Sequence, residues 1–361
     1  MSVDIDITGL PPERIVFSPS PLAELGAMLH ALSEPAHHPG LHGWATATAS
    51  SLKPDLADRL TEADFLWRSM RSDILLPPAP RATLAEELDD LDRMDDDSFV
   101  TAVFEITCSG DYERESVPSP LTDLRARARI RELAAARGPR QAEFTQRMLE
   151  NPTALRAWLR RLFEDCEEAF FGDNWQRVQV QLAADARHKG DLLRRKGLTE
   201  ALAAVSPAVS LSEDRHRIVV DKLANGRTKA YGNAITFVPT AFGWPHLLLV
   251  YRPGWQPVIQ YPVAGPEIPQ GAAPQLVQQR LEALRHPARM RMCQSLARGP
   301  HTTSELATSY GLTPPEVSRH IAVLKKAGLL STRRRGRYVL HQLDLTAVAR
   351  IGSDFLETVL R

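Results

Sequence analysis

The sequence contains little cysteine, with three residues among 361. Cys108, Cys166 and Cys293 lie far apart and form no C-x-x-C pair, which excludes a disulfide framework and fits a reducing compartment. Long apolar runs are missing, and the first residues, MSVDIDITGL, have neither the basic nor the apolar segment of a secretory signal. We therefore expect a cytoplasmic protein without a membrane partner.

Sequence motifs typical of enzymes are missing as well. The chain has no G-x-G-x-x-G, G-x-x-x-x-G-K-[ST], H-E-x-x-H or G-x-S-x-G pattern. Its 44 basic side chains balance 44 acidic ones, and 43% of its residues are apolar, as in ordinary globular proteins. We expect no enzymatic activity and no cofactor, in a chain long enough for more than one domain.

Residues 286–344 hold the most informative pattern of the chain. Thr302 with Glu305, and Thr313 with Glu316, each match the T-x-x-E capping box, in which a hydroxyl and a carboxylate satisfy unpaired backbone N–H groups. The two boxes predict two consecutive helices joined by the short segment Gly-Leu. This arrangement is typical of a helix-turn-helix.

The second of these helices has clear limits and a clear apolar side. Pro314 suits its first position, where no N–H is needed, and Gly328 suits its end. Val317, Ile321 and Leu324 follow the spacing i, i+4, i+7 and are predicted to be buried.

A basic hairpin is predicted after this helix. Leu329–Ser331 and Tyr338–Leu340 are suited to strands, and Gly336 suits a tight turn between them. The run Arg333–Arg335 would then lie at the tip. Helix, helix-turn-helix and hairpin together have the layout of a winged-helix domain.

The distribution of charge favours a nucleic-acid partner for this segment. Residues 275–361 contain 14 Lys and Arg against 6 Asp and Glu, a formal charge of +8 in a chain that is neutral overall. A positive field of this kind suits contacts with phosphates. Acidic residues are concentrated at Glu86–Asp97, which we interpret as a solvated helix face. The alternative is that this run mimics DNA and covers the basic hairpin of the same chain.

The first 265 residues are expected to form a separate, mainly helical domain with a short antiparallel β-meander. Helical patterns occur at Phe17–Leu32, 42–71, 82–94, 121–136, 151–170 and Trp175–Lys196, followed by a shorter helix that ends near Ser206. Strand patterns occur at Ile218–Val220, Ala234–Val238, Leu247–Tyr251 and Val258–Tyr261. The predicted fold is α+β, with domains at 1–265 and 275–361 joined by a linker at 266–274.

The C-terminal quarter resembles the ArsR/SmtB family of bacterial transcriptional repressors. The resemblance rests on HPARMRMCQSL, SELA-x-x-x-GL, VSRHIAVLKKAGLL and RRRGRYVLHQL. It implies a homodimer bound to a two-fold operator in double-stranded DNA, with the second helix in the major groove and the hairpin along the backbone. The expected base-reading residues are Thr313, Pro315, Glu316, Ser318 and Arg319, and the expected phosphate contacts are His320, Lys325, Arg333, Arg334, Arg335 and Arg337.

The family's dimers pair through flanking helices, and this chain has apolar positions at helical spacing on both sides of the domain. They could equally pack inside one chain. The candidate dimerisation residues are Val277, Leu281 and Leu284 before the domain and Val348, Ile351, Phe355 and Val359 after it.

Many members of this family sense metals, and here the chain departs from the pattern. The family's cysteine pair would fall at Thr302 and Ser304, and the segment 345–361 contains no His and no Cys. Cys293 lies on the apolar side of its predicted helix and is expected to be a small buried hydrophobe. We therefore expect no metal at the family's usual positions.

A second group of potential metal ligands lies near the N-terminus, in AHHPGLHGW. His37, His38 and His42 could bind zinc or nickel. Pro39 and Gly40 mark a turn, however, and histidines in a turn are more often exposed on the surface. The interpretation as a surface loop is favoured, and metal binding is left open.

The N-terminal region is similar, more loosely, to that of some actinobacterial regulators that place a helical-then-β region before a winged helix. The matching residues are FSPSPLAEL and AITFVPTAFGWP. The resemblance implies a sensing or assembly role. We expect this region to bind a small organic effector, and the alternative is that it is a protein-interaction module. Phe170, Phe171 and Trp175 could line a ligand pocket or belong to the core.

Overall fold

The computed structural model describes residues 2–69, 71–109, 118–222, 225–230, 234–252, 255–263, 274–335 and 338–360. The chain divides into two compact units, Met1–Glu267 and Ile268–Leu360, here called the N-terminal unit and the C-terminal unit. The predicted linker, 266–274, falls outside the described residues except for its last position. Within the described ranges, no helix is both long and apolar enough to cross a membrane.

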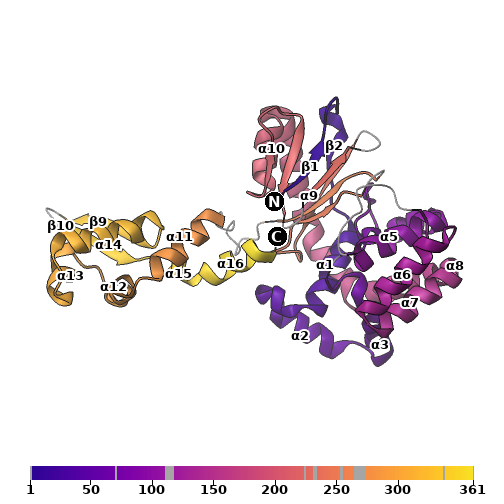
Figure 1. Ribbon diagram of the computed structural model, residues 1–361, viewed down its shortest axis with the longest axis horizontal. Coiled ribbons are helices and arrows are strands. Elements are labelled where there is room, and N and C mark those ends of the chain that lie inside the picture. Colours follow the sequence, from indigo (N-terminus) through magenta and orange to yellow (C-terminus); the bar gives the residue numbers. More distant parts are fainter. Residues whose placement is uncertain are drawn as a thin grey trace. The chain divides into compact units, whose positions relative to one another are not determined.

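Most of the N-terminal unit is helical. Short polar side chains begin its helices: the Ser20 hydroxyl accepts the Ala23 N–H at 3.1 Å, and Thr83 and Glu86 form a capping box. Figure 1 labels many of these elements. The helices are α1 (Pro21–Ser33), α2 (His42–Ser51), α3 (Pro54–Ala63), α4 (Leu84–Arg93), α5 (Asp96–Ser109), α6 (Leu124–Arg137), α7 (Pro139–Glu150), α8 (Pro152–Cys166), α9 (Gly172–Lys196) and α10 (Leu198–Val205), with short 3-10 turns that include η2 (Pro35–His37).

The predicted helical segments contain helices, but two helices were not predicted. Helix α5 has buried apolar residues on several sides, including Phe99, Val100, Val103 and Phe104, so it lacks the one-sided pattern of a surface helix. Helix α7 follows α6 directly through Gly138, which adopts φ 140. Phe144, Met148 and Leu149 lie on one buried side of α7, and Pro139 begins it, so the pattern of a helix was present in the sequence and was overlooked.

The strands of the N-terminal unit form two four-stranded sheets. One has the order β3 (Val209–Leu211), β4 (Arg217–Asp221), β1 (Ser2–Asp6) and β5 (Gly226–Lys229), and the other has the order β2 (Ile15–Phe17), β6 (Ile235–Thr240), β8 (Val258–Pro262) and β7 (Leu248–Val250). Strand β1 pairs antiparallel with β4 and parallel with β5. Strand β6 pairs parallel with both β2 and β8.

The prediction of an antiparallel meander was therefore wrong. The four predicted strands are present as β4, β6, β7 and β8, but they are divided between two mixed sheets. Each sheet is completed by a strand from the first 17 residues, β1 or β2. Such pairings join residues more than 200 positions apart, and a local sequence pattern cannot reveal them.

Two main cores hold the N-terminal unit together. A helical core is built around the fully buried Trp67, Phe104, Phe144 and Phe163. A second core lies between the sheets and α9 and α10, and it contains Ile5, Val220, Phe237, Ile259, Tyr261 and Leu202. The N-terminal strand β1 is thus an interior strand of the second core rather than an appendage.

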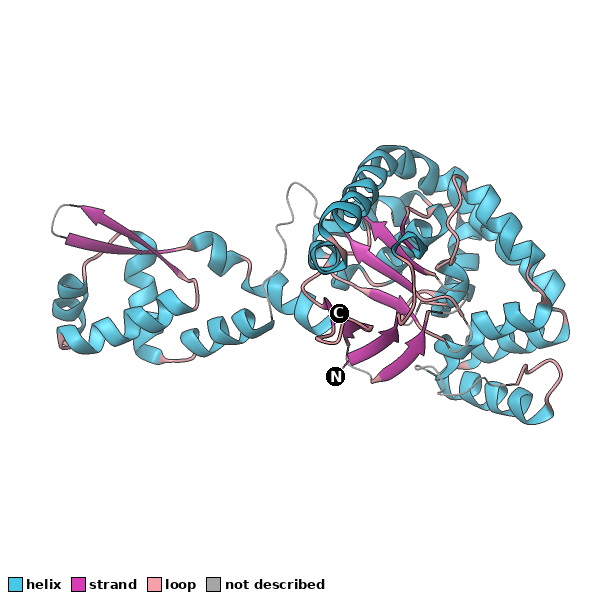
Figure 2. Ribbon diagram, turned by 90° about the horizontal axis from the view of Figure 1, so that it is seen from above, coloured by secondary structure: helices cyan, strands magenta, loops and turns pink. Residues whose placement is uncertain are grey.

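The C-terminal unit has the expected order of elements. It comprises α11 (Pro274–Leu284), α12 (Pro287–Arg298), α13 (Thr303–Tyr310), α14 (Pro314–Lys326), β9 (Leu330–Arg335), β10 (Tyr338–Leu343), α15 (Leu345–Ala349) and α16 (Ile351–Leu360). Its core includes Cys293, Leu296, Leu306 and Leu324. Cys293 is thus a buried apolar residue, as predicted. Figure 2 shows the β9–β10 hairpin as two adjacent arrows in this unit.

The position of β1 gives a prediction about stability. Ile5 is completely buried, and Ile5→Ala should lower the free energy of unfolding by about 2–5 kcal/mol, because it leaves a cavity in the second core. The measurement is urea unfolding followed by tryptophan fluorescence, since all six tryptophans precede residue 268. Val16→Ala on β2, where Val16 is 40% exposed, is the control and should change this free energy by less than about 1 kcal/mol. Equal effects of the two substitutions would show that β1 does not contribute to the core.

Candidate DNA-binding interface

The turn between α13 and α14 has the geometry that a helix-turn-helix requires. Gly311 ends α13 in the left-handed conformation, with φ 63 and ψ 33, and its N–H donates to Ala307. The Leu312 N–H donates to the same carbonyl at 3.0 Å. A side chain at Gly311 would be strained, because L residues disfavour positive φ. The predicted Gly-Leu turn is confirmed.

Both predicted capping boxes are present. The Thr302 N–H donates to Glu305 Oε2 at 2.7 Å, and Thr302 Oγ1 accepts the Glu305 N–H at 3.2 Å. The Thr313 N–H donates to Glu316 Oε2 at 2.8 Å. These hydrogen bonds to backbone N–H groups lower the pKa of Glu305 and of Glu316. Each carboxylate therefore carries its charge at the start of a helix, where the helix dipole favours it.

Helix α14 buries one side and exposes the other. Val317, Ile321 and Leu324 are at most 5% exposed, as their spacing predicted. The candidate contact residues Pro315, Ser318, Arg319 and Lys325 are exposed, as are Ala322 and Lys326. The exposed residues of α14 are thus one arginine, two lysines and small residues, together with Val323, which is 41% exposed. This side could approach a DNA groove without removing apolar groups from the core.

Three of the candidate contact residues have additional partners within the unit. Glu316 accepts hydrogen bonds from both the N–H and the hydroxyl of Thr313, so both side chains contribute to the helix start. The His320 ring lies 4.9 Å from the His286 ring, centroid to centroid. Partial burial, together with His286 and Arg289, lowers the pKa of His320. At neutral pH His320 can therefore donate a hydrogen bond but adds no positive charge.

The prediction that the arginine run lies at the tip, beyond a strand at Leu329–Ser331, was wrong, because β9 extends to Arg335 and contains all three arginines. Leu330 pairs with Leu343, and Arg333 and Arg334 pair with Leu340 and Val339. Since successive residues of a strand point to opposite faces, Arg333 and Arg334 point in opposite directions. Both are exposed. Arg335 is described only through its backbone pairing with Tyr338, and Arg337 lies outside the described residues.

A third backbone segment extends the hairpin. His301 and His341 exchange two backbone hydrogen bonds, of 2.9 and 2.8 Å. The bridge fixes β10 against the residue that precedes the first capping box. No sequence signal identified it, because an isolated bridge needs only one residue on each side.

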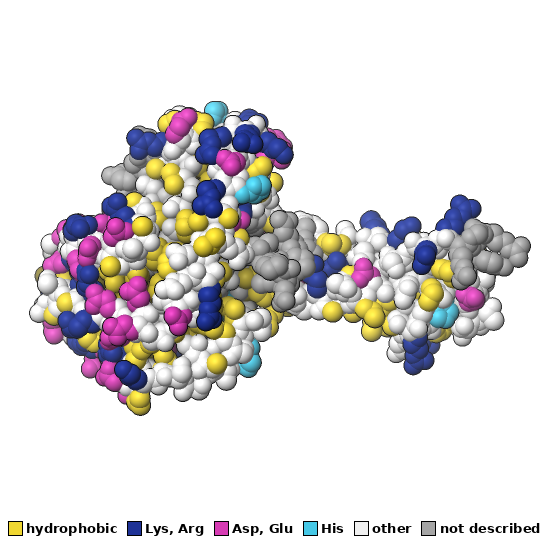
Figure 3. Space-filling model, turned by 180° about the vertical axis from the view of Figure 1, so that it is seen from behind, with side chains coloured by type: hydrophobic (Ala, Val, Ile, Leu, Met, Phe, Trp, Pro, Cys, Tyr) yellow, Lys and Arg dark blue, Asp and Glu magenta, His cyan; other side chains and the backbone are white. Residues whose placement is uncertain are grey.

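The charge is distributed unevenly on the surface. On the face shown in Figure 3, basic side chains are spread over the C-terminal unit, and acidic side chains gather on the N-terminal unit. Within the acidic run, Asp90 pairs with Arg81 and Arg93, and Asp96 pairs with Arg156. Most of these side chains are partly exposed, so the run has the ion pairs of an ordinary helix surface.

The candidate dimerisation residues divide into two groups. Val277 is 2% exposed, and Leu284, Val348 and Ile351 pack against the core of their own unit. By contrast, Leu281, Phe355 and Val359 are 40–44% exposed.

An ion pair fixes the two helices that carry the exposed group. Arg280 Nη1 on α11 lies 2.6 Å from Asp354 Oδ2 on α16, and Asp354 is only 3% exposed. A buried pair of this kind holds the two helices in one arrangement. Leu281, Phe355 and Val359 therefore belong to helices that are fixed to each other before any partner binds.

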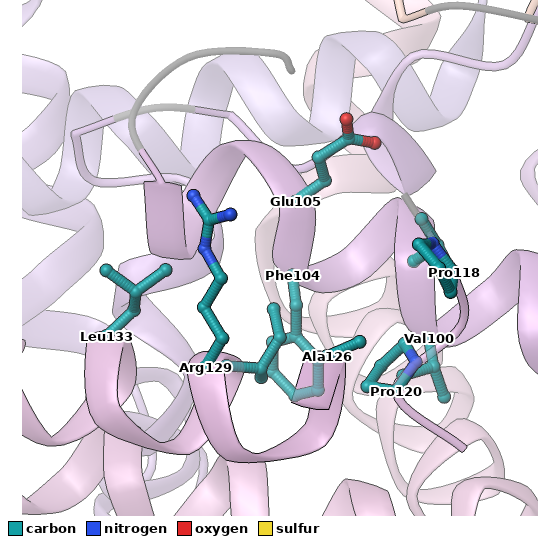
Figure 4. Close-up of a pocket in the computed structure, with 10 residues that line it drawn as sticks. Val100, Phe104, Glu105, Pro118, Pro120, Ala126, Arg129 and Leu133 are labelled. Carbon is teal, nitrogen blue, oxygen red and sulfur yellow. The ribbon is translucent and has the colours of Figure 1, made fainter. Parts of the chain in front are cut away.

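A small cavity lies between α5 and α6 in the N-terminal unit. Its lining includes Val100, Phe104, Glu105, Ala126 and Arg129, which Figure 4 shows together with Pro118 and Pro120. The volume, about 40 Å³, is far below the roughly 300–1,000 Å³ of pockets that hold organic ligands. This cavity cannot accept such a ligand as it stands.

A larger groove lies between β2 and α9. Its volume is about 600 Å³, within the range of organic-ligand pockets. Apolar side chains line most of it, and a few charged side chains converge on it. The lining includes Ile15, Phe17, Ala186, Leu193, Glu13, Arg187 and Arg194.

The aromatic residues that were candidate pocket residues lie elsewhere. Phe170 and Phe171 are at most 7% exposed and belong to the helical core, and Trp175 packs against that core. The Phe171 and Trp175 rings stack with centroids 5.8 Å apart. These three aromatic residues therefore pack in or against the helical core, which was the second of the two interpretations considered for them.

The histidines near the N-terminus do not form the expected surface loop. His38 is 1% exposed, and His37 and His38 lie beside His30 of α1 and His246 of the loop after β6. His42 begins α2 and is not among the histidines whose ring nitrogens come together, which are His30, His37 and His246. The sequence pattern missed His30 and His246, since one lies inside an apolar helix and the other more than 200 residues away.

Comparison with known proteins gives matches to both units. Residues 1–267 match the model described as "Family of unknown function (DUF5937)", and residues 284–333 match the model described as "Helix-turn-helix domain". A stretch of 71 residues is 32% identical to the biofilm growth-associated repressor of Agrobacterium fabrum, covering 20% of this chain and 61% of that protein. A stretch of 73 residues is 37% identical to the HTH-type transcriptional regulator Rv2034 of Mycobacterium tuberculosis, covering 20% of this chain and 68% of that protein.

Solved structures match the same share of the chain. The transcriptional repressor BigR from Xylella fastidiosa is 26% identical, and the match covers 24% of this chain and 88% of BigR with a TM-score of 0.20. All three relatives thus correspond to a quarter of the chain or less.

Proposed function

Given that the chain belongs to the DUF5937 family and carries a helix-turn-helix domain at residues 284–333, we propose that it is a DNA-binding transcriptional regulator of the ArsR type that acts as a repressor. The observation that carries this proposal is the exposed side of α14, with Ser318 and Arg319 on a helix whose opposite side is buried. The names of the two curated relatives, a repressor and a transcriptional regulator, support it.

In the proposed complex, α14 enters the major groove and the hairpin follows the phosphate backbone. Ser318 and Arg319 read base edges, together with Pro315. Thr313 and Glu316 set the start of the helix. Lys325 and the exposed arginines of β9 contact phosphates, and His320 adds a hydrogen bond.

We propose a homodimer as the DNA-binding form. The support is the exposed apolar group Leu281, Phe355 and Val359 on α11 and α16, which the Arg280–Asp354 ion pair holds together. Two copies joined there would present two α14 helices to two half-sites of an operator.

For the N-terminal unit, we propose that a small organic effector binds the groove between β2 and α9. The volume of about 600 Å³, the apolar lining and the charged Glu13, Arg187 and Arg194 support this role. An interaction module is the alternative, and Leu124 and Val180, 78% and 70% exposed, favour it. Native mass spectrometry of the purified chain separates the two, because a retained small molecule supports the effector and a retained protein supports the module.

The first test concerns sequence reading by α14. Ser318→Ala and Arg319→Ala should each reduce the preference for operator over random DNA, by on the order of 1–3 kcal/mol for each lost base contact. Fluorescence anisotropy with both DNAs gives the ratio of affinities. Arg177→Ala removes the same charge from an exposed site in the N-terminal unit and should leave the ratio unchanged. Full preference in both α14 variants would contradict the assignment of this helix to the groove.

The second test concerns the hairpin. Replacing Arg333, Arg334, Arg335 and Arg337 with Ala should weaken binding to every DNA sequence. The slope of log K against log salt should flatten by about 0.9 for each arginine that contacts a phosphate. The affinity is measured at several salt concentrations, and an unchanged slope would show that the arginines do not touch the backbone.

The third test concerns the dimer. Phe355→Glu combined with Leu281→Glu should shift the chain from dimer to monomer, because charged side chains disfavour burial at the interface. Sedimentation equilibrium gives the mass of each form. Val16→Glu changes an exposed apolar residue of β2 in the same way and should leave the dimer intact. A dimer that survives the double substitution would place the interface elsewhere.

A further inference from the structure

Four histidines meet in the interior of the N-terminal unit. His30 lies in the last turn of α1, His37 ends η2, His38 follows it, and His246 lies in the loop between β6 and β7. Their ring centroids are 4.7 Å apart for His30 and His246, 5.0 Å for His30 and His38, and 5.1 Å for His38 and His246. The His37 ring is 5.6 Å from both His30 and His246. We call this group the histidine cluster.

Backbone carbonyls fix the tautomer of two of these rings. His30 Nδ1 lies 2.8 Å from the Trp67 carbonyl oxygen, and His38 Nδ1 lies 2.6 Å from that of Trp244. A carbonyl can only accept, so each Nδ1 carries the hydrogen and, in the neutral ring, each Nε2 presents a lone pair. Histidines that bind metals are usually held in this way, with the second ring nitrogen donating to a carbonyl.

The lone pairs presented by the cluster are not all satisfied. His38 is 1% exposed, and its Nε2, which presents a lone pair, has no hydrogen-bond partner. The buried His37 Nδ1 has none either, and it presents a lone pair when that ring carries its hydrogen on Nε2. Burying an acceptor without a partner is unfavourable, so such atoms call for an occupant that accepts electron pairs. Because His30 Nδ1 carries its hydrogen, His30 Nε2 accepts a hydrogen bond from His246 Nε2–H at 3.1 Å, and a metal ion would replace that hydrogen. Two nitrogens bound to one tetrahedral zinc at 2.0–2.1 Å are about 3.3 Å apart, which is close to this separation.

The surroundings select the kind of ion. Arg71, a buried cation, lies near His30 and His38, and the buried carboxyl of Glu24 lies near Arg71. Because the positive charge of Arg71 repels a metal ion, an ion bound only by electrostatic attraction is disfavoured at this site. Among the described residues, those whose candidate ligand atoms come together are all histidines. Imidazole nitrogen suits zinc, nickel or copper, whereas magnesium and calcium prefer oxygen ligands.

We propose that the histidine cluster binds one divalent transition-metal ion of the zinc class through His30, His37 and His246, whose ligand nitrogens come together. His38 packs against the His30 and His246 rings, and a water molecule completes the coordination. One candidate nitrogen from each of these three histidines lies within 4.8 Å of the others, so the group is wider than a filled site and the rings must move closer together when a metal ion binds. The site belongs to the N-terminal unit, whereas Thr302 and Ser304 belong to the C-terminal unit. The proposal of a metal site does not depend on whether the chain binds DNA.

The test is a metal titration of the full-length chain after removal of metals with a chelator. Zinc sulfate is added in a calorimeter, and cobalt chloride is added in a spectrophotometer. We expect one equivalent of zinc to bind and to raise the melting temperature. Cobalt should give the intense visible absorption of a four-coordinate ion.

Three variants locate the site. His37→Gln and His246→Gln should each weaken zinc binding at least tenfold, and the double variant should lose the cobalt absorption. His42→Gln removes a histidine of the same sequence run from outside the described group and should bind zinc like the unaltered chain. Circular dichroism shows whether each variant folds, and if one does not, the other single variant still tests the site.

Two results would overturn the proposal. One is that the unaltered chain binds no zinc and no cobalt at micromolar concentrations, which would make the cluster a hydrogen-bonded part of the core. The other is that folded His37→Gln and His246→Gln variants bind zinc as tightly as the unaltered chain. Neither result bears on DNA binding, which the α14 and hairpin variants test separately.

Discussion

The burial of one side of α14 is the constraint on which the C-terminal unit depends. Val317, Ile321 and Leu324 enter a core shared with α12, α13 and the hairpin, and this fixes the rotation of the helix about its axis. Because the rotation is fixed, Ser318 and Arg319 must lie on the exposed side. The turn at Gly311 and the cap at Thr313 then set where the helix begins, so a few local interactions determine which side chains can meet DNA. Fixed geometry of this kind suits the reading of a sequence.

The N-terminal unit depends on a different constraint, the pairing of its first strands with its last. Strands β1 and β2 enter separate sheets, each beside a strand that follows residue 216. This pairing brings the chain after β6 back beside α1. The same closure puts His246 beside His30 and lets Glu24 accept the N–H groups of Ala241 and Phe242 at 2.9 and 3.0 Å. The histidine cluster is therefore a consequence of the long-range topology.

How much the sequence could predict follows from this contrast. In the C-terminal unit the capping boxes, the apolar stripe of α14 and the Gly-containing hairpin are local patterns, and the structure contains all of them. In the N-terminal unit the positions of β4, β6, β7 and β8 were predicted, but those of β1, β2, β3 and β5 were not. The partners of the strands were not predictable either, since pairing order leaves no mark within a short window. For the same reason His37 and His38 were noticed as neighbours in sequence, and His30 and His246 were not. The division of the arginine run over two faces depends on the length of β9, which extends to Arg335 and was predicted to end at Ser331.

The central claim is that the chain recognises a specific DNA sequence as a two-fold assembly. The most direct measurement is selection of bound DNA from a random library by the full-length chain, followed by sequencing. The account predicts an enriched motif with two-fold symmetry, whose half-sites are separated by about one helical turn, roughly 10 base pairs, or a multiple of it. Enrichment of no sequence, or of a single unrepeated half-site, would contradict it.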